Sequence, residues 1–191
     1  MNVYLPFKGT PTSAIAVEYS IRHETVPPHT HDYEEFVFVV RGTCKHRFGE
    51  REIPLIPGDI FLVPAHRTHS YIIDQTFTVY NVQFYPDRIS HQWGELWTGT
   101  GSITDQWHLL HSSLDSAKGV DELGKVPTSA SLNRLGILRL NTDEAAFATG
   151  LMEQMQREQQ QMLPDSERVL RAYLEILLVR LTRVRARQVA V

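Results

Sequence analysis

The residues best suited to chemistry lie in the stretch HTHDYEEFVFVVRG, residues 29–42, where His29 and His31 flank one threonine and precede Glu35. Imidazole nitrogens and carboxylate oxygens bind divalent metals and form directional hydrogen bonds with polar molecules. Because side chains alternate across a strand, we expect His29, His31, Tyr33 and Glu35 to share one face. The stretch therefore predicts a polar site on an otherwise apolar strand.

Three further segments carry polar side chains in the same alternating manner. His46 is expected on the same strand face as Cys44 and Phe48. In a second cluster, PAHRTHSY, His69 and Tyr71 share one face. The inward-facing polar groups expected from these segments are His46, His69, Tyr71, Asn81 and Gln83. Buried polar groups without partners cost about 1–3 kcal/mol each, so a barrel with this lining would hold water, a metal or a ligand.

The elements that would position these residues are short β-like runs separated by turn formers. The expected runs span residues 14–22, 34–42, 44–48, 51–56, 59–64, 69–73 and 76–86. Pro57 and Gly58 suit a type II turn, and FGERE is typical of a hairpin. Regularly spaced short strands of this kind predict a sandwich or a small barrel.

From about residue 88 onward the periodicity becomes helical. Residues 99–131 are rich in Gly, Ser and Thr and predict at most a short helix. Asn141 and Glu144 form a capping-box pattern that opens a helix running to about Met162, and Pro164 ends it. We thus predict a barrel over 1–90, an irregular connecting segment with short helices over 91–140, and a helical hairpin over 141–191.

The second helix of this hairpin, beginning near Asp165 or Ser166, has an apolar arc wider than one packing face requires. One interpretation is that part of the arc meets its hairpin partner and part meets a second subunit, which predicts a homodimer. The alternative is a helix that is buried on both sides within one subunit.

Composition limits the remaining possibilities. The 191 residues, with 42% hydrophobic and 21% charged side chains, suit one globular domain or one domain with a helical appendage. The sequence has no apolar run of about 20 residues and no secretory-signal layout at its start, which predicts a cytoplasmic protein without membrane contact. A single cysteine, Cys44, excludes an internal disulfide, and the net charge of −3 gives no reason to expect nucleic-acid binding by this domain.

The two polar clusters resemble the two motifs of the cupin superfamily. The first motif has two histidines one residue apart, then a glutamate and a glycine, and the matching residues are His29, His31, Glu35 and Gly42. The second motif is matched by Gly58, Pro64 and His69, whereas His66 and Ile73 depart from the usual glycine and asparagine. The resemblance implies that the metal ligands of metallocupins correspond to His29, His31, Glu35 and His69.

The order of the motifs over nearly the whole chain resembles the amino-terminal sensor domain of AraC/XylS-type bacterial transcription regulators, and most closely its rhamnose-responsive branch. This resemblance implies a mainly β fold, a cupin-like barrel (jelly roll) followed by an α-helical hairpin that dimerises. It implies a small-molecule effector, such as a sugar or another polar metabolite, inside the barrel. DNA would be bound only through a C-terminal helix-turn-helix domain, for which we expect no room after Val184.

The resemblance leaves two uses of the polar lining open. One is a site for Zn, Ni, Fe or Mn at the four cupin positions. The other is direct hydrogen bonding of the effector, for which the candidates are His29, His31, Tyr33, His46, His69, Tyr71, Asn81 and Gln83. A metal-dependent cupin enzyme, such as a dioxygenase or sugar isomerase, is the alternative function, and a plain dimerisation module is a third.

Overall fold

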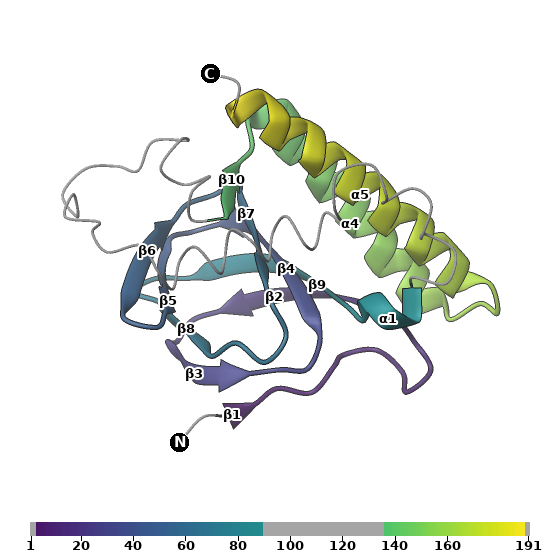
Figure 1. Ribbon diagram of the computed structural model, residues 1–191, viewed down its shortest axis with the longest axis horizontal. Helices are drawn as coiled ribbons and strands as arrows, with labels where there is room; N and C mark the ends of the chain where they lie inside the picture. Colours follow the sequence, from purple (N-terminus) through teal and green to yellow (C-terminus); the bar gives the residue numbers. More distant parts are fainter. Residues whose placement is uncertain (1–2, 90–135, 190–191) are drawn as a thin grey trace.

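The computed structural model describes residues 3–89 and 136–189, which form two five-stranded β-sheets and a helical hairpin (Figure 1). Sheet A contains, in spatial order, β1 (Val3–Tyr4), β3 (Val26–Thr30), β8 (His69–Ile72), β5 (Cys44–Phe48) and β6 (Arg51–Leu55). Sheet B contains β10 (Ile137–Arg139), β7 (Asp59–Val63), β4 (Glu34–Arg41), β9 (Phe77–Phe84) and β2 (Ile15–Arg22). The helices are α1 (Pro86–Ile89), α4 (Thr142–Gln161) and α5 (Ser166–Val189).

The inner faces of the two sheets meet and form the barrel. His46 of sheet A lies against Phe61 of sheet B, with 4.8 Å between their ring centroids. In β4, Glu35 pairs with Gln83 of β9 and with Val63 of β7, so these side chains share the inner face of sheet B. The barrel with helices at its carboxy-terminal end confirms the predicted fold class.

The turns follow the glycine chemistry expected from the sequence. Gly58 has a φ of 93°, as its place in a type II turn after Pro57 requires, and Gly49 at the β5–β6 hairpin has a φ of 60°. Gly42 has a φ of 78°, and a Cβ atom there would lie 2.0 Å from the Thr76 carbonyl oxygen. Only glycine allows the two chain segments to approach this closely.

The helical hairpin begins as its capping box predicts and packs on sheet B. The Asn141 side chain accepts a hydrogen bond from the Glu144 backbone nitrogen at 2.9 Å, and the Glu144 carboxylate accepts one from the Asn141 nitrogen at 3.0 Å. Met162 caps α4 in a left-handed conformation, with a φ of 48°. The second face of sheet B, which includes Phe36 and Phe38, belongs with the helices to one buried apolar core.

Two side chains of the hairpin also bond to the backbone of the edge strand β2 and of the residue before it. The amide of Gln159 accepts a hydrogen bond from the Val17 backbone nitrogen at 2.7 Å and donates one to the Val17 carbonyl at 3.1 Å. Glu167 accepts from the Ala14 nitrogen at 3.1 Å. The helices therefore cover part of the backbone edge that sheet B would otherwise leave open.

Three strands were not expected from the sequence. The sequences of β1 and β3 do not show the alternation of apolar and polar residues that marks a strand. In addition, β3 contains Pro27 and Pro28, which donate no backbone hydrogen bond. β10 lies within residues 91–140, predicted as irregular, and pairs with the distant β7. The rest of that prediction, an irregular segment with short helices over residues 91–135, lies outside the described residues. Among the residues that the structure describes, no helix has the length and apolar character needed to span a membrane.

Candidate functional site

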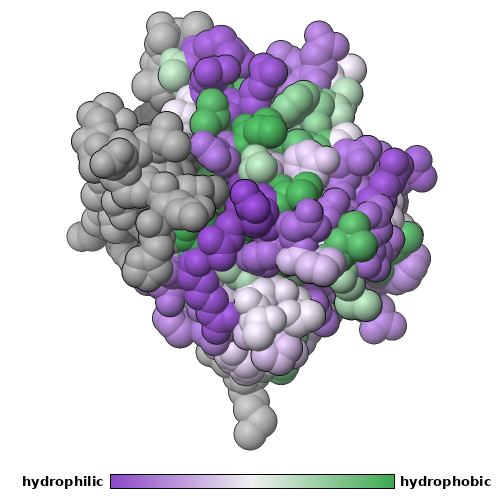
Figure 2. All heavy atoms as spheres, turned by 90° about the vertical axis from the view of Figure 1, so that its right-hand side faces the viewer, coloured by the Kyte–Doolittle hydropathy of each residue, from purple (hydrophilic) through white to green (hydrophobic). Residues whose placement is uncertain are grey.

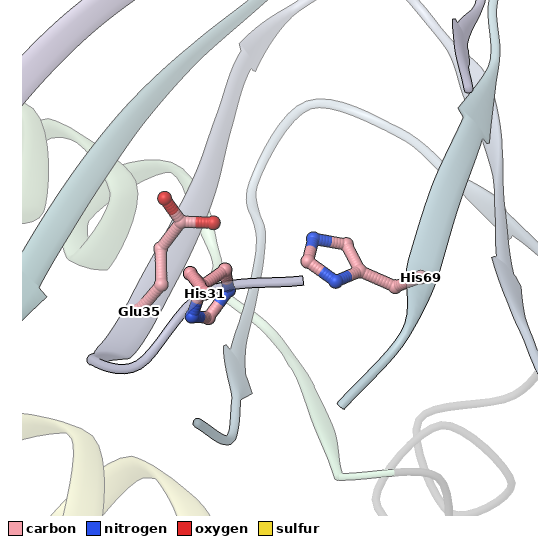
Figure 3. Close-up of side chains that lie close together, drawn as sticks. All are labelled: His31, Glu35 and His69. Carbon is pink, nitrogen blue, oxygen red and sulfur yellow. The ribbon is translucent and has the colours of Figure 1, made fainter. Parts of the chain in front are cut away.

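Three side chains of metal-ligand type meet inside the barrel (Figure 3). His31 follows β3, Glu35 lies in β4 and His69 opens β8, so two sheets and their connection contribute one residue each. One ligand atom from each residue lies within 4.8 Å of the others, and all three side chains are buried. This trio, His31–Glu35–His69, brings together three of the four residues predicted as metal ligands.

The histidines of the site are oriented by the protein backbone. Nδ1 of His31 lies 2.7 Å from the Tyr33 carbonyl oxygen, and Nδ1 of His69 lies 3.2 Å from the Arg67 carbonyl oxygen. A carbonyl oxygen only accepts, so each imidazole carries its proton on Nδ1 and leaves a lone pair on Nε2. The Nε2 atoms of His31 and His69 are buried and have no hydrogen-bond partner among the described residues. A backbone carbonyl at one ring nitrogen and a free lone pair at the other is the arrangement of a metal-binding histidine.

The fourth predicted ligand, His29, lies beside the trio without joining it. Its ring centroid is 4.0 Å from that of His69, and its Nδ1 lies 2.9 Å from the Pro27 carbonyl oxygen. His46 is close on another side, 5.6 Å from His69 between ring centroids, and stacks on Tyr71 at 4.9 Å. Four imidazoles thus gather in the interior of the barrel.

Polar residues of β9 extend the site toward the amino-terminal segment. Gln83 donates from Nε2 to Glu35 at 3.2 Å and accepts at Oε1 from the Lys8 backbone nitrogen at 2.9 Å. Asn81, two residues earlier, is buried, and its Oδ1 has no hydrogen-bond partner within the described part of the chain. Gln83 therefore connects a carboxylate of the site directly to the segment before β2.

Aromatic rings close the same end of the barrel. Tyr33 stacks on His31, with ring centroids 4.2 Å apart and an interplanar angle of 6°. Phe7 of the amino-terminal segment lies 5.7 Å from Tyr33 and 4.9 Å from Tyr85. The segment that includes Phe7 and Lys8 therefore covers the end of the barrel at which the trio lies.

Burial disfavours the charged forms of the groups of the site. It lowers the pKa of His29 and His31, and it lowers the pKa of His69 well below its ordinary value, with a further contribution from the His46 charge. Burial also raises the pKa of Glu35, against the opposing charge of Arg22. A neutral imidazole is the form that binds a metal, so burial favours the state of the histidines that metal binding requires.

A divalent metal fits this donor set. Two buried Nε2 lone pairs and a carboxylate are ligands of the kind that Zn, Ni, Fe and Mn accept. Ligand atoms that share an ion with bonds of about 2.0–2.2 Å are about 3.3–4.4 Å apart, so the ligand atoms of the trio, which lie within 4.8 Å of one another, would move closer together around an ion.

The structure corrects one step of the sequence reasoning. His29 lies in β3 of sheet A and Glu35 in β4 of sheet B, with His31 and Tyr33 in the connection between them. The four residues therefore do not share the face of a single strand, because the chain crosses from one sheet to the other. Their side chains still meet because the two sheets face each other.

All nine residues predicted to line the site are buried, and their roles remain predictions. The sequence reasoning missed Arg22, whose guanidinium lies 5.0 Å from the centroid of the Tyr71 ring. The sequence indicated only that Arg22 shares a strand face with Ser20 and Glu18 in the predicted strand 14–22; its place over Tyr71 depends on how the two sheets pack.

Comparisons with known proteins agree with this architecture. The family model of the AraC-like ligand binding domain matches residues 13–126. A curated relative, the HTH-type transcriptional activator RhaR of Escherichia coli (strain K12), is 26% identical over 127 residues, which are 65% of this chain and 45% of the relative. The activator of the same name from Cronobacter sakazakii (strain ATCC BAA-894) is 26% identical over 118 residues, which are 60% of this chain and 42% of the relative.

The solved structures that are similar to this chain include a cupin superfamily protein from Desulfitobacterium hafniense DCB-2, which is 18% identical. The match covers 37% of this chain and 67% of that protein, with a TM-score of 0.36. KdgF from Halomonas sp. is 21% identical, and the match covers 40% of this chain and 71% of KdgF, with a TM-score of 0.36. The match to the curated relatives spans less than half of their length.

Proposed function

Because the chain belongs to the family of AraC-like ligand binding domains, we propose that it is the effector-sensing domain of a bacterial transcription regulator. The effector is a small polar molecule, such as a sugar, and it binds inside the barrel. The observation that carries this proposal is the set of buried polar atoms that lack partners among the described residues, including Nε2 of His31 and His69 and Oδ1 of Asn81. Leaving such atoms unpaired costs about 1–3 kcal/mol each, and a bound ligand would recover part of that cost.

DNA contact belongs to a separate domain in this proposal. The relatives are named as HTH-type transcriptional activators, and the matched region covers less than half of them. The sensor would then act on the DNA-binding domain through a change in conformation.

The amino-terminal segment is the part of the barrel that we expect to respond to the effector. Val3 and Tyr4 pair with His29 and Thr30 in the parallel β1–β3 ladder, and Lys8 is bonded to Gln83. A molecule that takes the hydrogen bonds of Gln83 or Glu35 would change how this segment docks. Effector binding would thus alter the population of the docked state.

A divalent metal at the His31–Glu35–His69 trio is part of the proposal, and His29, which lies beside the trio, would become a fourth ligand by turning toward the ion. When bound, the metal would supply a positive charge and open coordination positions that polar groups of the effector can occupy. Backbone carbonyls at Nδ1 of His31 and His69 leave the Nε2 lone pairs of these two residues available to the ion.

Homodimerisation through α5 is the second part of the proposal. Ile176 and Val179 are 43% and 40% exposed although most apolar residues of α5 are buried. Seen from the side of the molecule on the right of Figure 1, the surface carries apolar patches separated by polar side chains (Figure 2). A charge-introducing double change, Ile176→Glu with Val179→Glu, should convert a dimer into a monomer in sedimentation experiments, whereas Gln154→Glu on the exposed face of α4 should not. A wild-type chain that sediments as a monomer at micromolar concentration would contradict this part.

A thermal-shift screen of sugars and related polar metabolites tests the binding function. The effector should raise the Tm of the wild-type chain, and the double change His29→Ala with Tyr71→Ala should abolish that rise. His23→Ala is the matched control, because His23 is exposed and bonded to Thr76 outside the barrel. An equal rise in the double variant would show that the effector binds elsewhere.

The trio also favours a second candidate, a metal-dependent cupin enzyme such as a dioxygenase or sugar isomerase. Two measurements separate the candidates. The gene can be sequenced past residue 191 for a helix-turn-helix domain, and metal-loaded protein can be incubated with the compounds that bind. Conversion of a bound compound to product would favour the enzyme.

A further inference from the structure

Arg22 is half-buried and places one guanidinium nitrogen inside the barrel without a hydrogen-bond partner among the described residues. It lies at the end of β2 opposite Phe77 of β9, on the same face as Ser20, and its guanidinium lies over the Tyr71 ring of the opposing sheet. Nε donates to Ser20 Oγ at 3.4 Å, whereas Nη1 is buried and has no hydrogen-bond partner among residues 3–89 and 136–189. None of the ion pairs between described residues includes Arg22.

Glu35 is the acidic residue whose charge acts on Arg22, but its carboxylate already has other interactions. Glu35 accepts the hydrogen bond from Gln83 and belongs to the trio, so a bound metal would take its charge. The Arg22 charge acts on Glu35, whose pKa it lowers against the effect of burial, but no ion pair joins the two described side chains: along β9, Arg22 pairs with Phe77 and Glu35 pairs with Gln83. A guanidinium is charged at every accessible pH, so Arg22 cannot relieve the cost of burial by losing its proton.

We propose that the effector is a small organic anion whose carboxylate is bound by Arg22. This inference rests on the proposed function and names the chemical class of its ligand. The planar guanidinium presents paired N–H donors that match the two oxygens of a carboxylate, and the Tyr71 ring beneath it holds its plane. Asn81 offers an unpaired oxygen to a hydroxyl group. A hydroxylated carboxylate, such as a sugar acid, satisfies these groups better than a neutral sugar, and a cationic ligand is repelled.

The first test needs no ligand. Removing the buried Nη1 atom, which lacks a partner among the described residues, should stabilise the empty barrel, so Arg22→Gln should raise the Tm of the ligand-free protein by about 2 °C or more. Arg41→Gln, at the exposed end of β4, is the matched control and should leave the Tm unchanged. A drop in the Tm of Arg22→Gln would identify Arg22 as a structural counter-ion of Glu35 and would overturn the proposal.

The second test uses matched pairs of acid and neutral sugar at constant ionic strength. Galacturonate is compared with galactose and gluconate with glucose, and acetate serves as a probe of charge alone. At least one acid should raise the Tm of the wild-type protein more than its neutral parent does. Arg22→Gln should weaken the binding of that acid about 10- to 100-fold, and Arg22→Lys, which keeps the charge but not the paired donors, should weaken it less.

The outcomes separate this inference from the function on which it rests. If neutral sugars stabilise the protein and acids do no better, the anionic effector is wrong and the sensing function stands. If no compound of either kind changes the Tm, the inference is overturned and the proposed function loses support as well. An acid that stabilises Arg22→Gln as strongly as the wild type also overturns the inference.

Discussion

Replacing His69 with leucine should have opposite effects on stability with and without metal. His69 is 1% exposed, and its Nε2 has no hydrogen-bond partner in the described part of the chain. Removing an unpaired buried nitrogen relieves about 1–3 kcal/mol, and losing the bond to the Arg67 carbonyl costs about 0.5–1.5 kcal/mol. The metal-free variant should therefore gain about 1 kcal/mol, which raises the Tm by about 2–4 °C for a chain of this size.

The sign reverses when Zn²⁺ or Ni²⁺ is added to a protein without an affinity tag. At a metal concentration 100 times the Kd, the wild type should gain about 2.7 kcal/mol, or about 5–11 °C in Tm. His69→Leu should gain little, because the trio has lost one of its nitrogen ligands. Differential scanning calorimetry at matched protein concentration, with and without metal, measures both effects.

His23→Leu is the control for this experiment, since His23 is exposed and lies outside the barrel. It should keep the wild-type response to metal. The reasoning is refuted if metal-free His69→Leu is less stable than the wild type by more than about 1 kcal/mol, because His69 would then be an ordinary packed core residue. It is also refuted if the variant responds to metal as strongly as the wild type.

Three further predictions concern the scaffold. Gly42→Ala should lower the free energy of unfolding, measured in urea, by at least about 1–3 kcal/mol, because Gly42 has a positive φ and lies against the Thr76 carbonyl. Gly150→Ala, in the open interior of α4, should instead raise the free energy of unfolding by about 0.5–1 kcal/mol. Burial raises the pKa of the Cys44 thiol to about 12 from an ordinary 9.0. At pH 9 the folded protein should therefore react with a disulfide reagent about 500-fold more slowly than the unfolded chain. The stability that this pKa shift contributes is complete below pH 9 and is lost as the pH rises toward 12. Asn141→Ala should cost about 1 kcal/mol by removing one half of the capping box, and an unchanged urea midpoint would contradict that assignment.

Most of the barrel could be predicted because its signals are local. Alternating apolar residues marked β2, β4 and β9, and the Pro57–Gly58 pair and the capping box each depend on a few neighbouring residues. The predicted burial of the polar residues of β9 was also correct, because phase within one strand depends only on its own sequence.

What the sequence could not supply was the pairing of distant segments. β10 has three residues and gains its partners from β7, about 80 positions earlier in the chain. β3 contains two prolines and forms only because β8 and β1 lie beside it. The same limit applied to Arg22, whose position over Tyr71 depends on how the two sheets face each other.

The bonds between Gln159 and Val17 have a consequence for the isolated barrel. A side-chain amide there takes the place of the peptide group of a neighbouring strand, so β2 cannot recruit a strand from another molecule at that point. A barrel truncated before residue 141 would lose this substitute and present an unpaired backbone edge to solvent. Such a fragment should aggregate by edge-to-edge association, so the helices protect solubility in addition to any part they take in assembly.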